Sequence, residues 1–284
     1  MSILKTPDWI DQFKYPYDKF DEVPSALFDQ INKDLNQVQT KDAVVSIVIA
    51  ARNEEINILK CVASLSKMRT EIPFEIIVVN NNSVDQTQKT LDHLHVKSLF
   101  EPNKGCGPAR QLGQENAAGK YILLADADCL YPDCWVDEMI KVLSREGVVC
   151  VYGRYSFINE PSYPRWQLKI YETMKDIIAE YRHINRPYFN AYGLSMGFVK
   201  KYGLEVGFVR TGFWGDDGKL CLDLMKYGKV KQVRSNRARA WTSPRTLKRD
   251  GGFGKAFTGR LFKELKRFTF NLHSQLPEDK NHKK

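Results

Sequence analysis

Apolar runs and amphipathic segments alternate between residues 44 and 152, and this alternation limits the possible folds more than any other feature. Runs rich in Val, Ile and Leu are expected to be strands, and they lie at residues 44–50, 74–79, 96–100, 121–125 and 148–152. Helices are expected between them, at residues 53–65, 85–94, 105–117 and 135–143. The alternation predicts an α/β domain with a mostly parallel, Rossmann-like sheet.

Polar side chains follow three of the expected strands. Arg52-Asn53-Glu54 follows the first strand, Asn80-Asn81-Asn82-Ser83 the second, and Asp126-Ala127-Asp128 the fourth. In parallel sheets ligands bind beyond the carboxyl ends of the strands, so these residues should converge on one ligand. Two carboxylates at the end of a buried strand are costly without a cation. Because Mg²⁺ commonly binds one or two carboxylates together with substrate phosphates, we expect a metal–diphosphate site; the alternative is a solvated turn.

The remaining segments divide the chain into three parts. Residues 1–42 are expected to form an extension that packs on the main domain, and residues 43–245 form that domain. The half after Gly153 is irregular: it includes a helix at 165–182, a close-approach loop or strand at 190–197, a helix at 219–227 and an edge strand within 230–241. Residues 246–284 are expected to form a basic amphipathic helix and a disordered tail.

Charge and composition exclude several classes of protein. The net charge is +9, but residues 226–284 carry 17 Lys and Arg against four Asp and Glu, so the main domain is slightly acidic. A nucleic-acid-binding module would spread basic and aromatic residues more widely, and we expect no nucleic-acid partner. The basic C-terminal helix favours either docking on the domain or peripheral contact with an anionic membrane.

Localisation is expected to be cytoplasmic, with possible contact at the inner face of a membrane. The sequence has no apolar run of about 18 residues that would span a bilayer and no apolar signal-peptide core near its first residues. The six cysteines show no paired spacing, which favours reduced core thiols over zinc or disulfide sites.

Five short motifs occur in the order typical of one enzyme family. They are Ala50-Ala51-Arg52-Asn53-Glu54-Glu55, Asn80-Asn81-Asn82-Ser83-Val84-Asp85-Gln86-Thr87, Asn103-Lys104-Gly105 with Gly107-Pro108-Ala109-Arg110, Asp126-Ala127-Asp128, and Gly215-Asp216-Asp217. Over residues 43–245 this order resembles glycosyltransferase family 2, the inverting nucleotide-sugar glycosyltransferases with the GT-A fold. The resemblance implies transfer of one sugar from a nucleotide-sugar donor, with a UDP-sugar as the default, to a hydroxyl acceptor.

The resemblance also implies roles for individual residues. Asp128 would bind Mn²⁺ or Mg²⁺, and Asp126 would lie near the ribose or the waters of the metal. The residues implied to contact the nucleotide-sugar are Ala51, Arg52, Glu54, Asn81, Asp85, Arg110, Asp126 and Ala127. Asn81 departs from the usual Asp of the family, and its amide oxygen could still accept a hydrogen bond from a uracil N–H, with GDP and dTDP as alternatives to UDP.

An inverting transfer needs a general base that removes the proton of the acceptor hydroxyl. By resemblance Asp217 is this base, and Asp216 stands where the family has Glu. The alternative is that both residues only stabilise the helix that follows, because carboxylates favour helix N-termini.

Two other functions remain open at this stage. A sugar-phosphate nucleotidyltransferase would need a Gly-rich phosphate loop after the first strand, which this sequence lacks. A non-catalytic nucleotide-sugar-binding protein would lack Asp128 or Asp217, and both are present. The expected acceptor is a saccharide or a lipid-linked sugar, in the synthesis of cell envelope, polysaccharide or glycolipid.

Overall fold

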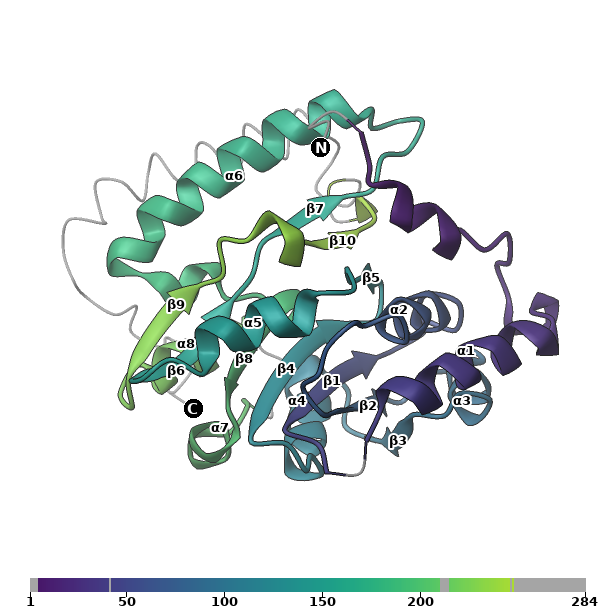
Figure 1. The fold of residues 1–284 in the computed structure, drawn as a ribbon, viewed down its shortest axis with the longest axis horizontal. Coiled ribbons are helices and arrows are strands. Elements are labelled where there is room, and N and C mark those ends of the chain that lie inside the picture. Colours follow the sequence, from purple (N-terminus) through teal and green to yellow (C-terminus); the bar gives the residue numbers. More distant parts are fainter. Residues whose placement is uncertain (1–4, 41, 210–214, 246, 248–284) are drawn as a thin grey trace.

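The computed structural model describes residues 5–40, 42–209, 215–245 and 247. A seven-stranded sheet with the order β3-β2-β1-β4-β8-β6-β9 forms its centre (Figure 1). The strands are β1 (Val45–Ala51), β2 (Phe74–Asn80), β3 (Lys97–Phe100), β4 (Tyr121–Asp126), β6 (Val148–Tyr152), β8 (Met196–Val199) and β9 (Lys229–Gln232). Strands β1 to β4 pair in parallel, which confirms the predicted α/β fold with a mostly parallel sheet.

Helices cover both faces of the sheet because side chains alternate along each strand. Val45, Ile47 and Ile49 point to one face and pack with apolar residues of α1, α2 and α5, whereas Val48 points to the other face and packs with those of α4 and α8. The helices on the two faces are α1 (Ser25–Val38), α2 (Asn57–Leu65), α3 (Thr87–Asp92), α4 (Cys106–Glu115), α5 (Trp135–Leu143), α7 (Lys200–Val206) and α8 (Asp216–Leu224). The buried sheet thus forms a rigid support for its carboxyl edge.

The second half of the chain departs from the simple alternation. Strand β8 lies between β4 and β6 and runs antiparallel to both, so β4 and β6 run in the same direction without touching. Residues 190–197 were expected as a loop or strand. They contain the end of the 3-10 helix η3 (Pro187–Asn190), all of the 3-10 helix η4 (Gly193–Ser195) and the first residues of β8. Residue 197 has to be glycine to fit between β4 and β6, because a Cβ there would clash with Leu123, at 2.5 Å from its Cδ2.

The prediction of one edge strand within residues 230–241 was incomplete. Strand β9 does form an edge of the large sheet, but β10 (Ala240–Thr242) is the middle strand of a second sheet with the order β5-β10-β7. Its partners are β5 (Cys129–Leu130) and β7 (Tyr155–Phe157). The polar stretch between β9 and β10, which includes the 3-10 helix η5 (Asn236–Ala238), separates the two strands, and periodicity could not show which sheet each would join.

Several predicted helix boundaries were displaced. The first helix of the domain begins at Asn57 and not at Asn53, because residues 52–56 form a loop in which Asn53 has a positive φ of 55°. The helix expected from Lys219 begins at Asp216, so both aspartates lie in its first turn. Helix α6 (Arg165–Asn185) extends three residues beyond its predicted end and crosses above β7 and β10 (Figure 1).

The N-terminal residues pack into the same core as the sheet. The 3-10 helix η1 (Asp8–Phe13) buries Ile10 and Phe13, and α1 buries Phe28, Ile31 and Leu35. A further 3-10 helix, η2 (Phe20–Glu22), connects them. The predicted basic C-terminal helix and tail lie outside the described residues.

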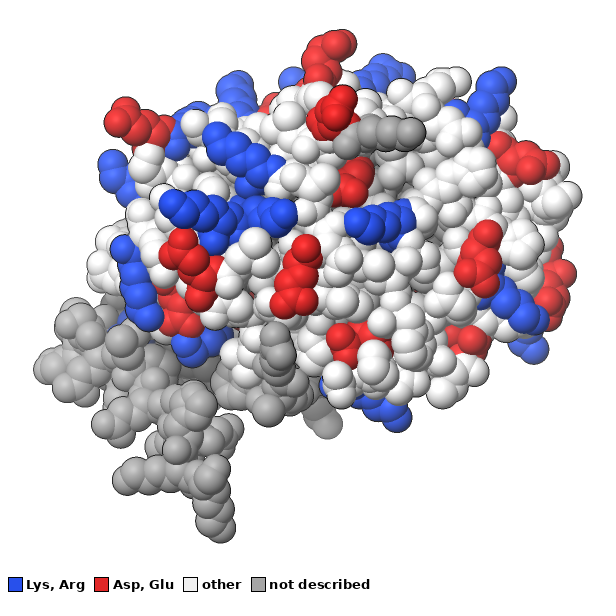
Figure 2. Space-filling model, turned by 90° about the horizontal axis from the view of Figure 1, so that it is seen from below, with Lys and Arg blue, Asp and Glu red and all other residues white. Residues whose placement is uncertain are grey.

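The surface that lies below the sheet in Figure 1 carries mixed charges. Figure 2 shows Lys and Arg side chains interspersed with Asp and Glu on this face, without a large patch of either sign. Among the described residues, no helix has both the length and the hydropathy that a membrane span requires.

Candidate active site

The candidate site lies at the carboxyl edge of β1, β2 and β4, which carries the polar residues singled out in the sequence. Ala51 and Asn80 are paired at the ends of β1 and β2, and Asp126 ends β4 opposite Ala50. Two groups of charged side chains form next to Asp126 and Asp128, each organised by one arginine. Arg110 organises the first group, and Arg245 organises the second.

Arg110 is a buried cation that contacts three carboxylates. Its Nη2 donates to Asp126 Oδ1 at 3.1 Å, and its Nη1 donates to Asp216 Oδ2 at 2.9 Å and also to Asp217 Oδ1. The Arg110 side chain is only 5% exposed; α4 supplies Arg110, and α8 supplies Asp216 and Asp217. The structure therefore joins the predicted donor residues to the predicted base.

Backbone groups around η4 fix the position of this cluster. The Gly193 N–H donates to Asp217 Oδ2 at 2.6 Å, and a Cβ at Gly193 would lie 1.8 Å from Arg110 Nη2. Only glycine leaves room for the guanidinium. Tyr131 connects β4 to η4, because its hydroxyl accepts from the Asp126 N–H at 2.9 Å and donates to the Leu194 carbonyl at 2.8 Å.

Burial and crowding separate the carboxyl groups by their proton affinity. Burial raises the pKa of Asp216 to about 6 against the opposing effect of Arg110. Burial also acts on Asp217, but Arg110, a hydrogen bond with Asp216 and the Gly193 N–H together lower its pKa below the ordinary value. Burial and neighbouring carboxylates raise the pKa of Asp126 to about 7. Asp217 is thus the carboxylate of this cluster that most readily stays ionised.

Arg245 joins the predicted metal ligand to the loop after β1. Its Nη2 donates to Asp128 Oδ2 at 2.6 Å and to Glu54 Oε1 at 2.8 Å. Two carboxylates from different strand ends therefore converge on one positive charge. Among the described residues, no three His, Cys, Asp or Glu side chains lie close enough to hold a metal ion without other ligands.

Two of the residues implied to contact nucleotide are engaged in holding loops. The Asn81 amide donates to the carbonyls of Glu101 and Asn103 at 3.3 and 2.6 Å, and its Oδ1 accepts from the Gly105 N–H at 2.7 Å. The Asp85 carboxylate accepts from the backbone N–H groups of Glu55 and Thr87 at 3.3 and 3.0 Å. Both side chains shape the edge of the site, and a contact with nucleotide remains a prediction for each.

The other implied residues lie along the same edge. Ala51 is buried at the end of β1, where its carbonyl accepts from the Asn81 N–H at 2.8 Å, and Ala127 is buried between the two aspartates. Arg52 is exposed beside Glu54. Trp241 in β10 is only 7% exposed and lies beneath the Arg165 guanidinium.

Sequence reasoning missed three residues that define this geometry: Arg245, Gly193 and Tyr131. Arg245 stands three residues after β10 ends, and a lone basic residue after a strand could have been a signal. Gly193 lies in the segment 190–197 that was expected to make a close approach, but its partner Arg110 could not be inferred from the sequence, and Tyr131 had no signal, because a hydroxyl bridge depends on tertiary contacts.

Replacing Arg245 with Gln is expected to strengthen Mn²⁺ binding when no nucleotide is present. If Asp128 binds a metal, Arg245 would compete with it for Asp128 and Glu54, and because the Arg245 side chain is 51% exposed, loss of these ion pairs is worth no more than about 1 kcal/mol, or roughly a fivefold lower Kd. Calorimetric titration of Mn²⁺ into both proteins measures the change. Arg237→Gln, at an exposed arginine that pairs weakly with Glu138, is the matched control. An equal or higher Kd in Arg245→Gln would show that Arg245 does not compete for the site.

The fold and the site together define the class of protein. It is an α/β protein in which carboxylates and arginines cluster at the carboxyl edge of the sheet. The model of glycosyl transferase family 2 matches residues 46–202, more than half of the chain. The chain belongs to this family, which confirms the predicted relationship.

Curated relatives resemble the chain over only part of their length. Glycosyltransferase AglE of Haloferax volcanii is 30% identical over 121 residues, which are 40% of this chain and 40% of AglE. The uncharacterized glycosyltransferase RC0461 of Rickettsia conorii is 27% identical over 149 residues, 51% of this chain and 23% of that protein. The chain therefore aligns with less than half of either relative.

Solved structures support the GT-A fold at low sequence identity. Mannosyltransferase PcManGT from Pyrobaculum calidifontis, in complex with GDP-Man and Mn²⁺, has a TM-score of 0.53 and 16% identity, over 77% of this chain and 64% of that one. S. aureus TarS 1–349, in complex with UDP-GlcNAc, has a TM-score of 0.53 and 17% identity, over 70% and 58%. GalNAc-T7 with UDP, GalNAc and Mn²⁺ has a TM-score of 0.55 and 16% identity, over 72% and 44%. At these identities the likeness concerns the fold alone.

Proposed function

We propose that this chain is a metal-dependent, inverting glycosyltransferase that moves one sugar from a nucleotide-sugar, by default a UDP-sugar, to an acceptor hydroxyl. One observation carries this proposal. Arg110 joins Asp126, at the end of β4, to Asp216 and Asp217, at the start of α8. The donor edge and the proposed base are therefore parts of one charged cluster.

The residues present fit a divalent cation that shares its coordination with a diphosphate. Asp128 and Glu54 converge on the positive charge of Arg245, and their side chains are 24% and 16% exposed. Mg²⁺ usually takes one or two carboxylates and completes its shell with substrate phosphates and water. Asp128 would hold the cation with Glu54 nearby, and the cation would stabilise the negative charge that develops on the departing nucleoside diphosphate.

Residues of the protein carry out the proton transfer that accompanies the transfer of the sugar. Asp217 takes the proton of the acceptor hydroxyl while the acceptor oxygen bonds to the anomeric carbon from the face opposite the diphosphate. The bond from that carbon to the diphosphate oxygen breaks, and the nucleoside diphosphate leaves with the electron pair. Arg110 and the Gly193 N–H hold Asp217 in its ionised form and in place.

The donor and metal assignments are supported by what related folds bind. PcManGT was solved with GDP-Man and Mn²⁺, and TarS with UDP-GlcNAc. Asn81 already uses both amide hydrogens and one lone pair of Oδ1 on the loop around Gly105, so recognition of a uracil N–H would rest on the remaining lone pair. For the acceptor we propose a saccharide or lipid-linked sugar of the cell envelope, a polysaccharide or a glycolipid.

Hydrolysis of nucleotide-sugars without an acceptor tests this function directly. The full chain should release nucleoside diphosphate from at least one of UDP-, GDP- and dTDP-sugars, and only with Mn²⁺ or Mg²⁺. Addition of EDTA should reduce the rate by at least about 100-fold, because the cation contributes several kcal/mol to the transition state. Equal rates with and without metal would contradict metal dependence, and absence of binding to every nucleotide-sugar would contradict the transferase assignment.

A further inference from the structure

The outward face of α6 is apolar along almost the whole helix. The exposed positions 166, 170, 173, 177, 181 and 184 are spaced by three or four residues, so they form one stripe about 27 Å long. Trp166, Ile170, Ile177 and Ile184 are between 50% and 74% exposed. None of the six positions carries a charge, whereas the solvent face of a surface helix normally does.

The opposite side of α6 packs on the domain. Leu168 and Tyr171 are buried in a small core together with Phe157, Tyr163 and Leu247. The helix crosses above β7 and β10 at the outside of the molecule (Figure 1). The stripe therefore does not belong to the core of the domain. Single exposed apolar side chains are common, but a contiguous row of them marks an interaction surface.

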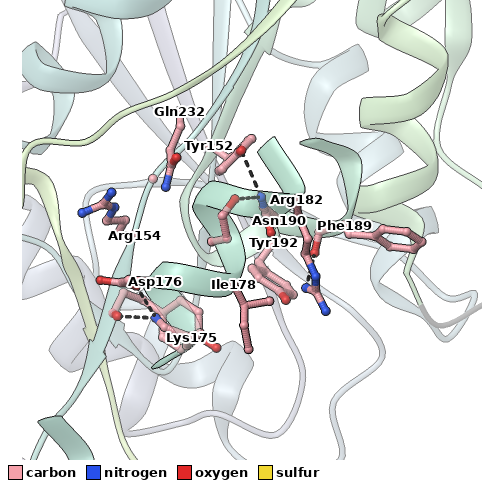
Figure 3. Close-up of a pocket in the computed structure, with 13 residues that line it drawn as sticks. Tyr152, Arg154, Lys175, Asp176, Ile178, Arg182, Phe189, Asn190, Tyr192 and Gln232 are labelled. Atoms are coloured by element: carbon pink, nitrogen blue, oxygen red, sulfur yellow. Dashed lines mark hydrogen bonds and ion pairs between the residues drawn. The ribbon is translucent and has the colours of Figure 1, made fainter. Parts of the chain in front are cut away.

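The charged side chains of α6 lie apart from the stripe and are compensated there. Lys175 and Asp176 line a cavity of about 270 Å³ on the inner side of the helix, beside η3 (Figure 3). Each of the three carboxylates of α6 is paired with arginine: Glu172 with Arg165, Asp176 with Arg239, and Glu180 with Arg154 and Arg234. No carboxylate of α6 is therefore left uncompensated beside the stripe.

A strongly basic segment of the chain begins beside α6. Leu247, the last described residue, is 1% exposed and lies in the same small core as Leu168, in the first turn of the helix. Residues 248–284 lie outside the described residues, and their sequence carries ten Lys and Arg against four Asp and Glu, a net charge of +6. Because the chain is continuous, this positive charge follows directly after a residue that packs on α6.

The stripe and the basic segment together fit the surface of an anionic membrane. An amphipathic helix can bury its apolar face at the boundary between lipid headgroups and acyl chains, a depth at which Trp is enriched. Neighbouring Lys and Arg side chains add attraction to anionic lipids. A second copy of the chain fits the stripe less well, because pairing of two α6 helices would bring together two segments of net charge +6.

We propose that α6 binds the surface of an anionic lipid bilayer through its outward stripe, and that the basic sequence after Leu247 strengthens this contact. The inference goes beyond the proposed function, because lipid binding does not require sugar transfer. Arg245, which contacts Asp128 and Glu54, stands two residues before Leu247. The membrane contact would therefore begin close to the donor site, which suits a lipid-linked acceptor.

Sedimentation of the full chain with lipid vesicles tests the proposal. One set of vesicles consists of phosphatidylcholine alone, and in the other about one lipid in three is phosphatidylserine. The chain should bind the anionic vesicles at least about tenfold more strongly than the neutral ones, and added salt should weaken this binding. Equal binding to both kinds of vesicle, or binding to neither, would overturn the proposal.

Variants of exposed residues locate the contact on α6. Ile170→Asp and Ile177→Asp should each lower the partition coefficient onto anionic vesicles at least about tenfold, because a carboxylate in the stripe opposes both insertion and the charge of the lipid. Ile177→Leu should keep the wild-type value. Leu204→Asp places the same charge at an exposed position of α7, at the opposite edge of the molecule in Figure 1, and should change binding by less than about twofold. If both α6 variants bind as the wild type does, the proposal fails.

Measurements without lipid separate the remaining explanations. Sedimentation velocity should give the same oligomeric state for the wild type and for Ile177→Asp. A dimer that Ile177→Asp dissociates would assign the stripe to a second copy of the chain and overturn the proposal. Ile177→Asp should also keep metal-dependent donor hydrolysis, which shows that the variant is folded. Absence of donor hydrolysis in the wild-type chain would contradict the proposed function and leave the result with vesicles unaffected.

Discussion

Asp217→Asn is expected to reduce the kcat of sugar transfer by about 10²–10⁴-fold, the usual contribution of a general base. An amide of the same size cannot take the proton of the acceptor hydroxyl, but its oxygen can still accept the Gly193 N–H. Arg110 keeps two carboxylate partners, Asp126 and Asp216, so the fold should persist. Steady-state transfer kinetics, with the KM for donor measured in parallel, give the result.

The control for this prediction lies on the same helix. Asp223 is on α8, where it pairs with Lys219 and Lys226 away from Arg110, and Asp223→Asn should retain transfer within about twofold. Asp216→Asn separates the two neighbouring carboxylates: both contact Arg110, but the Asp216 side chain is the less exposed to an acceptor, so we expect a smaller loss of kcat. If Asp216→Asn lost sugar transfer completely and Asp217→Asn kept it, the general base would be Asp216 and not Asp217.

Asp128→Asn is expected to reduce the rate of donor hydrolysis by at least about 100-fold, since metal stabilisation of the leaving diphosphate is worth several kcal/mol. The remaining rate should no longer depend on metal. The neutral amide loses the charge that would bind the cation, and it also weakens the contact with Arg245. Titration of Mn²⁺ in the presence of UDP should show a Kd raised by more than tenfold.

Asp133→Asn provides a matched carboxylate near Asp128 in the sequence. Asp133 is 46% exposed and pairs only loosely with Arg69, at 3.4 Å, so its replacement should leave both Mn²⁺ binding and hydrolysis unchanged. Wild-type hydrolysis in Asp128→Asn would contradict the assignment of the metal ligand. Equal losses in both variants would point to a general change in fold.

The sequence predicted the central sheet well because its signals are local. The strands expected at 44–50, 74–79 and 121–125 appear as β1, β2 and β4, since a run of apolar residues in this register has to be buried on both faces. The polar residues that follow these strands are also a local signal, and they identified the carboxyl edge of the sheet. Five motifs in order were then sufficient to indicate the family.

Local signals could not predict contacts between distant segments. The insertion of β8 between β4 and β6, and the place of β10 in a second sheet, depend on which strands meet across the chain. Arg110 was assigned to the donor, and its ion pairs with Asp216 and Asp217, 106 and 107 residues away, became visible only in three dimensions. Arg245 reaches Glu54 across 191 residues.

The sequence by itself determined the strand–helix order, the polar carboxyl edge and the family, because each is carried by neighbouring residues and their periodicity. Only the tertiary structure decided how the charges are shared: Arg110 among three carboxylates, Arg245 between Asp128 and Glu54, and the carboxylates of α6 with arginines away from its apolar stripe. Electrostatic energies depend on the distances and burial of side chains, and these are set by packing between segments far apart in the chain.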